Sequence, residues 1–272
     1  MNIDRNLLNQ VVDVALKAGK AVMEVYAQEF SSEDKDDKSP LTEADLASNR
    51  TIVAGLKAID PTTPILSEEM KAAPYAEREG WSRLWVVDPL DGTKEFIKRN
   101  GQFTVNIALV EKGVPILGVV HAPAIDTTFA AAQGVGAIKV DRGEDRPIRV
   151  ANAPTDTIRI VASLSHNTPE TQAMIDAAGT RYAAVETLSL GSSLKLCMVA
   201  DGRADLYPRL APTMEWDTCA AQAVVEQAGG TVVNTKGERL TYNRAELLNP
   251  WFLVVGDPSI PWRDFLPAAL TA

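Results

Sequence analysis

The sequence of 272 residues has few of the residue types that mark secreted, zinc-binding or nucleic-acid-binding proteins. Its two cysteines, Cys197 and Cys219, are too few for a disulfide framework, and their spacing matches no zinc motif. It also has only two histidines, His121 and His166, so any metal chemistry would depend on carboxylates rather than imidazoles. A net charge of −9 provides no basic surface for a nucleic acid polymer.

Long hydrophobic runs are also missing. No apolar run approaches the ~18 residues that a membrane-spanning helix needs, and the first residues, MNIDRNLLNQ, lack a signal-peptide layout. We therefore expect a cytoplasmic protein, monomeric or homodimeric and without a transmembrane segment, with peripheral association at the inner face of the cell membrane as the alternative. An acidic protein that binds an anionic substrate needs local positive charge, which a metal cluster or converging Lys and Arg residues would supply.

Apolar periodicity predicts two different halves. A long amphipathic helix is predicted over residues 4–28 with Asp4 as its N-cap, and a second helix from an N-cap at Thr42 to about Ala58. Four strands joined by turn signals predict an antiparallel meander at residues 104–110, 116–121, 127–132 and 137–140.

The charged, turn-rich stretch 141–147 marks the expected boundary, after which strands and helices alternate. We therefore predict an N-terminal α+β half, residues 1–146, and a C-terminal α/β half, residues 147–272. The metal and phosphate loop would belong to the first half and the contacts to the rest of the substrate to the second.

The stretch WVVDPLDGTKEF, residues 85–96, joins an apolar strand to two acids. Asp88 and Asp91 follow the apolar run, and Pro89 disfavours a helical conformation for Asp88. Carboxylates at the end of a buried strand need a positive partner, and two that share a centre repel each other unless a cation lies between them. Mg²⁺ prefers such oxygen ligands.

Gly92 permits a tight turn after these acids, and the amides of Gly92 and Thr93 can face an anion. The segment 93–98 is predicted to be a short helix whose N-terminus faces the same anion. A divalent cation makes bound water easier to deprotonate. The pattern therefore predicts metal-assisted hydrolysis of a phosphate ester.

Three further acids lie at the ends of predicted elements: Asp45, Glu68 and Asp217. The short apolar strand 64–66 ends in Ser67-Glu68-Glu69. Asp45 and Asp217 lie in the first turns of predicted helices, where the helix dipole favours an acid. On pattern alone that structural interpretation is favoured for Asp45. The sequence contains no Gly-x-Ser-x-Gly elbow and no P-loop.

Three motifs resemble those of the inositol monophosphatase superfamily. Residues 85–93 resemble its first signature, residues 216–221 followed by 226–230 resemble its second, and Ser67-Glu68-Glu69 stands where that family has a Glu-Glu pair. Within the superfamily, Asp-Gly-Thr-Lys-Glu-Phe at residues 91–96 is similar to the 3′(2′),5′-bisphosphate nucleotidases. Further similarity to that subfamily lies at residues 38–45, 163–166 (with Leu164 in place of an arginine), 191–195 and 207–209.

The resemblance implies a layered αβαβα fold like that of sugar phosphatases, with two or three Mg²⁺ ions per site. Glu68, Asp88 and the Leu90 carbonyl would hold one ion, and Asp88, Asp91 and Asp217 a second. The implied catalytic residues are Asp45, Glu68 and Thr93, which moves the interpretation of Asp45 from helix dipole to catalysis. The implied substrate contacts are Glu68, Leu90, Asp91, Gly92, Thr93, Lys94, His166, Ser192, Lys195, Arg209 and Asp217.

The resemblance leads us to expect a lithium-sensitive enzyme of sulfate assimilation that hydrolyses adenosine 3′,5′-bisphosphate, with its 5′-phosphosulfate form as a second candidate substrate. An inositol monophosphatase or a sugar bisphosphatase of the same fold is the alternative, and Lys94 and Glu95 argue against it. The alternative from another class is a non-catalytic phosphate-binding regulator.

Overall fold

The computed structural model describes residues 2–28, 40–163 and 168–270. The predicted substrate contact His166 and the substituted position Leu164 lie outside these residues. None of the described helices is both long enough and apolar enough to cross a lipid bilayer.

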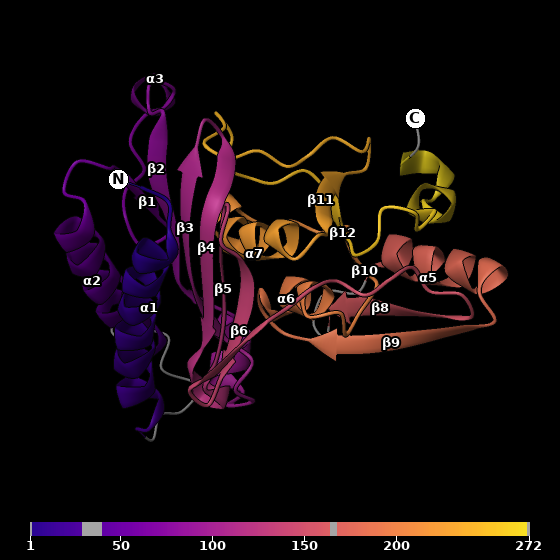
Figure 1. Cartoon of the computed structure of the whole chain (residues 1–272), viewed down its shortest axis with the longest axis horizontal. Helices are drawn as coiled ribbons and strands as arrows, with labels where there is room; N and C mark the ends of the chain where they lie inside the picture. The colour runs from indigo at the N-terminus through magenta and orange to yellow at the C-terminus, as the bar shows by residue number, and fades with distance from the viewer. Residues whose placement is uncertain (1, 29–39, 164–167, 271–272) are drawn as a thin grey trace.

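The described chain forms two sheets (Figure 1). The first has seven strands in sequence order, antiparallel except for the parallel pair β1–β2. Its strands are β1 (Ile65–Ser67), β2 (Arg83–Asp91), β3 (Thr104–Glu111), β4 (Val114–Ala122), β5 (Thr127–Ala132), β6 (Gly136–Asp141) and β7 (Glu144–Pro147). The second has the order β11-β12-β10-β8-β9. Its strands are β8 (Thr157–Ser163), β9 (Ala184–Leu190), β10 (Leu206–Arg209), β11 (Thr231–Asn234) and β12 (Phe252–Val255).

The helices complete the layers. The α-helices are α1 (Arg5–Tyr26), α2 (Pro40–Ile59), α3 (Tyr75–Arg78), α4 (Thr93–Ile97), α5 (Pro169–Arg181), α6 (Leu194–Ala200) and α7 (Glu215–Gln227). The short 3₁₀ helices are η1 (Pro123–Ile125), η2 (Trp262–Phe265) and η3 (Ala268–Leu270).

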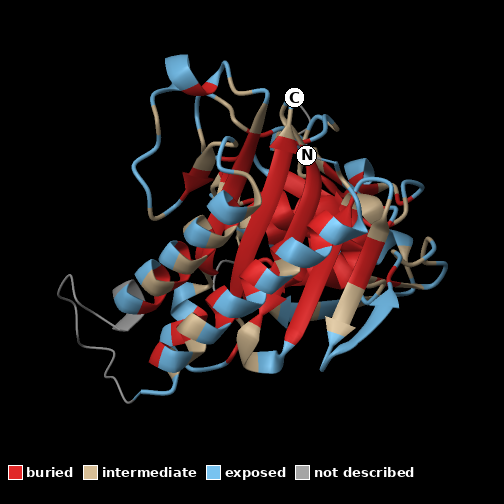
Figure 2. Ribbon diagram, turned by 60° about the vertical axis from the view of Figure 1, so that its left-hand side comes forward, coloured by how far each residue is buried: buried red, intermediate tan, exposed pale blue. Residues whose placement is uncertain are grey.

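Three apolar clusters hold these layers together. One joins α1 and α2 to the first sheet, one joins both sheets to α6 and α7 between them, and one joins the second sheet to α5 and η2. Figure 2 shows the burial that results: the central strands of the first sheet are buried, while α1 and α2 are exposed along their outer faces. The order helix, sheet, helix, sheet, helix confirms the predicted αβαβα arrangement.

The two N-terminal helices test the predicted caps. Asp4 does cap α1, because its Oδ1 accepts the Leu7 N–H at 2.9 Å. The predicted N-cap at Thr42 is wrong, since α2 already begins at Pro40 and Thr42 lies inside it. Proline suits the first position of a helix because the N–H that it lacks would have no helical partner there.

Two parts of the first sheet differ from prediction. β2 does not end before Asp88 but continues to Asp91, with a register shift between these two residues in its pairing with β3. The stretch 141–147, predicted to be only a boundary, contains the exposed edge strand β7. Charged residues protect an edge strand from pairing with other chains. The division after residue 146 stays a prediction.

Helix α7 packs on the first sheet at Gly118 in the middle of β4. A Cβ atom added there would lie 2.1 Å from the Ala220 carbonyl oxygen of α7 and 2.8 Å from the Ala223 Cβ. Only glycine therefore lets the helix approach this closely, and that approach carries the N-terminus of α7 toward the end of β2.

Gly118→Ala should destabilise the fold by about 1–3 kcal/mol, because the added methyl group forces α7 away from β4. Gly179→Ala is the matched control, since a Cβ in that exposed helical position meets only Val185 at 3.8 Å. The control should be neutral or stabilising by about 0.5–1 kcal/mol. Urea unfolding measures both, and equal midpoints for the two variants would contradict the tight contact.

Candidate active site

Strand pairing brings two of the predicted acids together. β1 and β2 run parallel with Ser67 opposite Val87, so the residues that follow, Glu68 and Asp88, emerge side by side at one edge of the sheet. The Glu68 N–H donates to the Val87 carbonyl at 3.2 Å. Asp217 reaches the same point from the first turn of α7. Carboxylate oxygens of Glu68, Asp88 and Asp217 lie within 4.8 Å of one another.

The bulge in β2 places Asp91 beside this cluster. The Leu90 N–H donates to Asp88 Oδ1 at 3.0 Å, which fixes the turn between the two acids. The Pro89 carbonyl accepts the hydroxyl of the buried Ser48 from α2 at 2.8 Å. The bulge therefore directs Asp88 and Asp91 to a common region and leaves Leu90, the predicted carbonyl ligand, between them.

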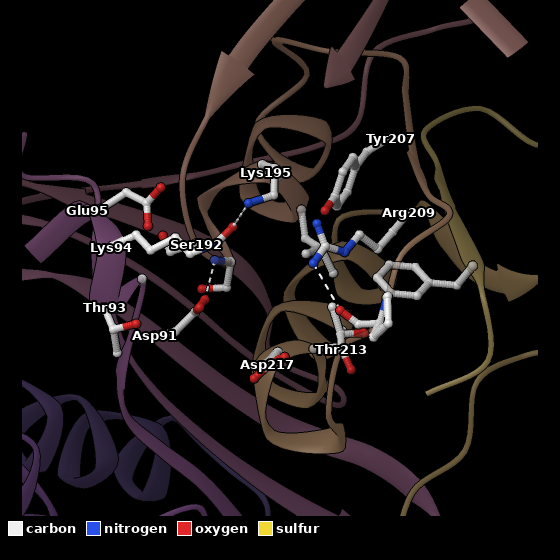
Figure 3. Close-up of a pocket in the computed structure, with 16 residues that line it drawn as sticks. Asp91, Thr93, Lys94, Glu95, Ser192, Lys195, Tyr207, Arg209, Thr213 and Asp217 are labelled. Carbon is white, nitrogen blue, oxygen red and sulfur yellow. Dashed lines mark hydrogen bonds between the residues drawn. The ribbon is translucent and has the colours of Figure 1, made fainter. Parts of the chain in front are cut away.

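Asp91 and Asp217 line one side of a cavity of ≈ 270 Å³ (Figure 3). Lys195 and Arg209 line its other side. Asp91 Oδ2 accepts the Ser193 N–H at 2.5 Å, a contact that joins β2 to the start of α6. One pocket therefore has an acidic side from the first sheet and α7 and a cationic side from α6 and β10.

Gly92, Thr93 and Lys94 form the rim of this cavity. Gly92 has φ +94°, a backbone conformation that favours glycine, and a Cβ there would lie only 3.0 Å from the Gln102 carbonyl oxygen. Glycine is therefore required at this position for both reasons. Thr93 opens α4, and Thr93 and Lys94 are exposed. The start of α4 therefore belongs to the lining of the cavity.

Burial and mutual repulsion raise the pKa values of the clustered acids. Burial raises the pKa of Asp88 well above its ordinary value, with Asp91, Glu68 and Asp217 adding to the effect. Burial and Asp91 raise the pKa of Asp217 to about 7. Burial also raises the pKa of Glu68, with Glu69 and Asp91 adding to it. Burial raises the pKa of Asp91 as well, although Lys195 and the Ser193 N–H oppose this shift.

A close group of carboxylates such as this one, with Asp88 buried, Asp217 half-buried and Glu68 exposed, is stabilised by a proton or a cation between its oxygens. Its donors are all hard carboxylate oxygens, without a cysteine or histidine within the described cluster. That donor set fits Mg²⁺ and not zinc. The residues present therefore match the metal that the motifs imply.

Asp45 lies next to the cluster on α2 and is buried. Burial raises its pKa to about 8, with Glu69 and Glu68 adding to the shift. A carboxyl group with a pKa near neutrality suits proton transfer. The helix-dipole interpretation alone would leave this acid exposed and its pKa low, which is not what the structure describes.

The cationic side is held in place by short contacts. Lys195 Nζ donates to the Ser192 carbonyl at 2.6 Å and lies 5.9 Å from the centre of the Tyr207 ring. Burial lowers the Lys195 pKa to about 8, although Asp91 opposes the shift. Arg209 Nη2 donates to the Pro212 carbonyl at 3.0 Å, while its buried Nε has no hydrogen-bond partner among the described residues.

Sequence reasoning missed two features of this site. Ser193 contributes a backbone N–H to Asp91, and no side-chain pattern reveals a backbone contact. Tyr207 lines the cavity between the two cations, and its buried phenol has a raised pKa because of desolvation. Its place in the quoted Tyr207-Pro208-Arg209 motif was the available signal. The roles of the predicted site residues stay predictions.

Comparisons with known proteins agree with this geometry. A family model described as the inositol monophosphatase family matches residues 4–251. The chain is 45% identical over 251 residues to a Salmonella typhimurium protein named 3′(2′),5′-bisphosphate nucleotidase CysQ, with 91% of this chain and 99% of that protein covered. A Haemophilus influenzae protein of the same name is 37% identical over 278 residues, with 97% and 98% covered.

Comparison with solved structures also finds members of this family. The crystal structure of CysQ from Bacteroides thetaiotaomicron, described as a bacterial member of the inositol monophosphatase family, matches with a TM-score of 0.85 and 43% identity over 94% of this chain and 98% of that one. An inositol monophosphatase from Anabaena matches with a TM-score of 0.73 and 26% identity, covering 97% of each chain. These matches confirm the resemblance that the motifs indicate: the chain belongs to the inositol monophosphatase family.

Proposed function

We propose that this chain is a Mg²⁺-dependent 3′(2′),5′-bisphosphate nucleotidase that hydrolyses adenosine 3′,5′-bisphosphate to AMP and inorganic phosphate. The observation that carries the proposal is the single pocket in which Asp91 and Asp217 lie opposite Lys195 and Arg209. A substrate with two phosphate groups could place one phosphate against the acidic side, through bound metal, and the other against the cationic side. The 45% identity to a relative with this name, over 91% of the chain, supports the same substrate.

The acidic side would bind two or three Mg²⁺ ions. Glu68, Asp88 and the Leu90 carbonyl would hold one ion, and Asp88, Asp91 and Asp217 a second. When bound, the metal would neutralise charge on the transferring phosphoryl group and make water easier to deprotonate.

The reaction breaks the bond between phosphorus and the 3′ oxygen of the ribose, which takes up a proton and leaves as the 3′ hydroxyl of AMP, and forms a bond between phosphorus and a water oxygen. Asp45 is suited to accept a proton from that water, because burial and the neighbouring Glu69 raise the pKa of its carboxyl group and so make the carboxylate a stronger base. The Thr93 hydroxyl would orient the same water. The N–H groups at the start of α4, beside Gly92, would bind the departing phosphate.

The cationic side would select the substrate. Lys195 and Arg209 would bind the second phosphate of the nucleotide through charge-assisted hydrogen bonds. A substrate with one phosphate, such as inositol 1-phosphate, would leave these cations without a partner. Ser192 and Lys94 would contact the remaining parts of the nucleotide. The 5′-phosphosulfate form would bind in the same position as adenosine 3′,5′-bisphosphate.

A phosphate-release assay with Mg²⁺ tests this function directly. We expect kcat/KM for adenosine 3′,5′-bisphosphate to exceed that for inositol 1-phosphate by on the order of 100-fold, because a charged pocket rejects a ligand that leaves its polar groups unpaired. The 5′-phosphosulfate nucleotide and fructose 1,6-bisphosphate complete the substrate panel. Equal or better turnover of inositol 1-phosphate would exclude the nucleotidase assignment.

Asp91→Asn should lower kcat by about 10²–10³-fold, because it removes a charged ligand of the metal ion that would stabilise the transferring phosphoryl group. The variant should stay folded, since the asparagine oxygen still accepts the Ser193 N–H and one like charge leaves a repelling cluster. Asp141→Asn, at the exposed end of β6, is the control and should keep full activity. A folded Asp91→Asn variant with undiminished turnover would remove Asp91 from the mechanism.

Adding MgCl₂ should raise the melting temperature, because the ion binds the folded cluster and relieves its repulsion. At 100 times the dissociation constant the gain is ~2.7 kcal/mol. NaCl at the same ionic strength is the control and should give little change, and EDTA should reverse the effect. Differential scanning fluorimetry measures all three; the same shift in Asp88→Asn as in the unaltered chain would place the metal elsewhere.

A further inference from the structure

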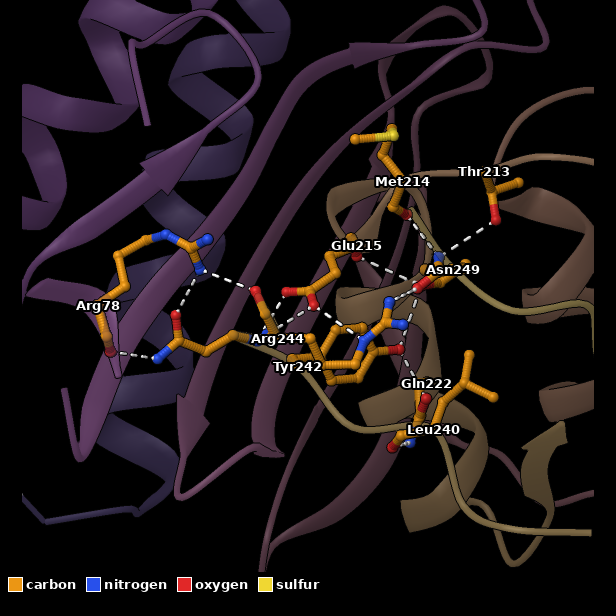
Figure 4. Close-up of polar contacts among 11 residues, drawn as sticks. Arg78, Thr213, Met214, Glu215, Gln222, Leu240, Tyr242, Arg244 and Asn249 are labelled. Carbon is orange, nitrogen blue, oxygen red and sulfur yellow. Dashed lines mark hydrogen bonds and ion pairs between the residues drawn. The ribbon is translucent and has the colours of Figure 1, made fainter. Parts of the chain in front are cut away.

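Helix α7 begins with a fully buried acid that does not line the cavity. Glu215 has 0% exposure, and its carboxylate accepts three hydrogen bonds from one distant segment (Figure 4). They come from the Asn243 N–H at 2.7 Å, the Arg244 N–H at 3.0 Å and Arg244 Nε at 3.1 Å. An apolar residue would serve stability as well as a buried ion pair does, so this arrangement calls for another explanation.

The same segment is also connected by hydrogen bonds to the rest of the first turn of α7. Arg244 Nη2 donates to Asn249 Oδ1 at 2.8 Å. Asn249 Nδ2 then donates to the Met214 carbonyl at 2.6 Å and to Thr218 Oγ1 at 3.0 Å. The residues before and after Glu215 are therefore fixed by one connected network, in which each polar group supports the geometry of the next.

The network also reaches the segment that leads into β2. Asn243 Nδ2 donates to the Arg78 carbonyl at 2.6 Å, and Arg78 Nη1 returns a bond to Asn243 Oδ1 at 2.9 Å. Arg78 is 3% exposed and closes α3, five residues before β2 begins at Arg83. The start of α7 is thus tied to the chain that carries Asp88 and Asp91.

Glu215 and Asp217 share the first turn of α7 but point in different directions. Two residues along a helix correspond to a rotation of about 200°, so Asp217 faces the carboxylate cluster while Glu215 faces the network. Asp217 Oδ2 also accepts the Met214 N–H at 2.8 Å, so its position depends on that turn. We propose that Glu215 is a positioning residue, which acts through Asn243 and Arg244 to hold Asp217 where it can bind a metal ion. The inference rests on the proposed function.

Isothermal titration with MgCl₂ alone tests the inference without substrate. Glu215→Gln should weaken Mg²⁺ binding by about 10–100-fold, the effect expected when the support of a metal ligand is lost. Glu226→Gln is the matched control: Glu226 lies at the far end of the same helix, where it pairs with Arg239 and accepts a hydrogen bond from Gln222, and this variant should keep the Mg²⁺ affinity of the unaltered chain. Equal weakening in both variants, or unchanged affinity in a folded Glu215→Gln, would overturn the proposal.

Phosphate release from adenosine 3′,5′-bisphosphate gives a second readout. Excess Mg²⁺ should restore the kcat of Glu215→Gln, because all ligands are still present, whereas a catalytic loss would persist at saturating metal. If Glu215→Gln does not fold, Arg244→Lys takes its place, since lysine keeps the charge but cannot contact Glu215 and Asn249 together. Its Mg²⁺ affinity should fall, and an unchanged value would overturn the proposal. Failure of the proposed function would instead appear as absent turnover with normal Mg²⁺ binding.

Discussion

The mutual repulsion of clustered carboxylates is the constraint on which the rest of this structure depends. Glu68, Asp88 and Asp217 hold oxygens within 4.8 Å of one another, and burial raises the pKa of each. Arg209 offsets only part of this repulsion, at Asp217, so the acids must be held together by the elements that carry them. Three features keep the acids together: the parallel pairing of β1 with β2, the bulge in β2, and the close approach of α7 at Gly118.

The position of α7 explains why the two sheets work as one site. The helix lies between the sheets within a single apolar cluster, and its first turn carries Asp217. Gly118 in β4 allows the backbone of α7 to approach the first sheet closely, and the hydrogen-bond network around Glu215 and Arg244 holds the first turn of α7 in position. Apolar packing sets the distance of the helix from the sheet, while directional hydrogen bonds set its axial position.

Charges of opposite sign divide the pocket into two sides. The Ser193 N–H joins Asp91 to the start of α6, which also carries Lys195, so the acidic and cationic sides are mechanically connected. In the proposed function this arrangement suits an anionic ligand with two separated charges, because a bound metal would contact one phosphate and Lys195 and Arg209 would contact the other. The overall charge of −9 would otherwise repel such a ligand.

The sequence by itself determined the local features: the amphipathic helices, the strand meander, the acids at strand ends and the motifs that indicate the family. These follow from period, turn chemistry and short-range spacing. It could not determine that β2 continues through the Asp88 bulge, that α2 starts at Pro40, or that Glu215 is buried away from the cavity. Tertiary structure decided these points, because strand register, the approach of α7 and the meeting of Glu68 with Asp217 depend on contacts between residues far apart in the chain.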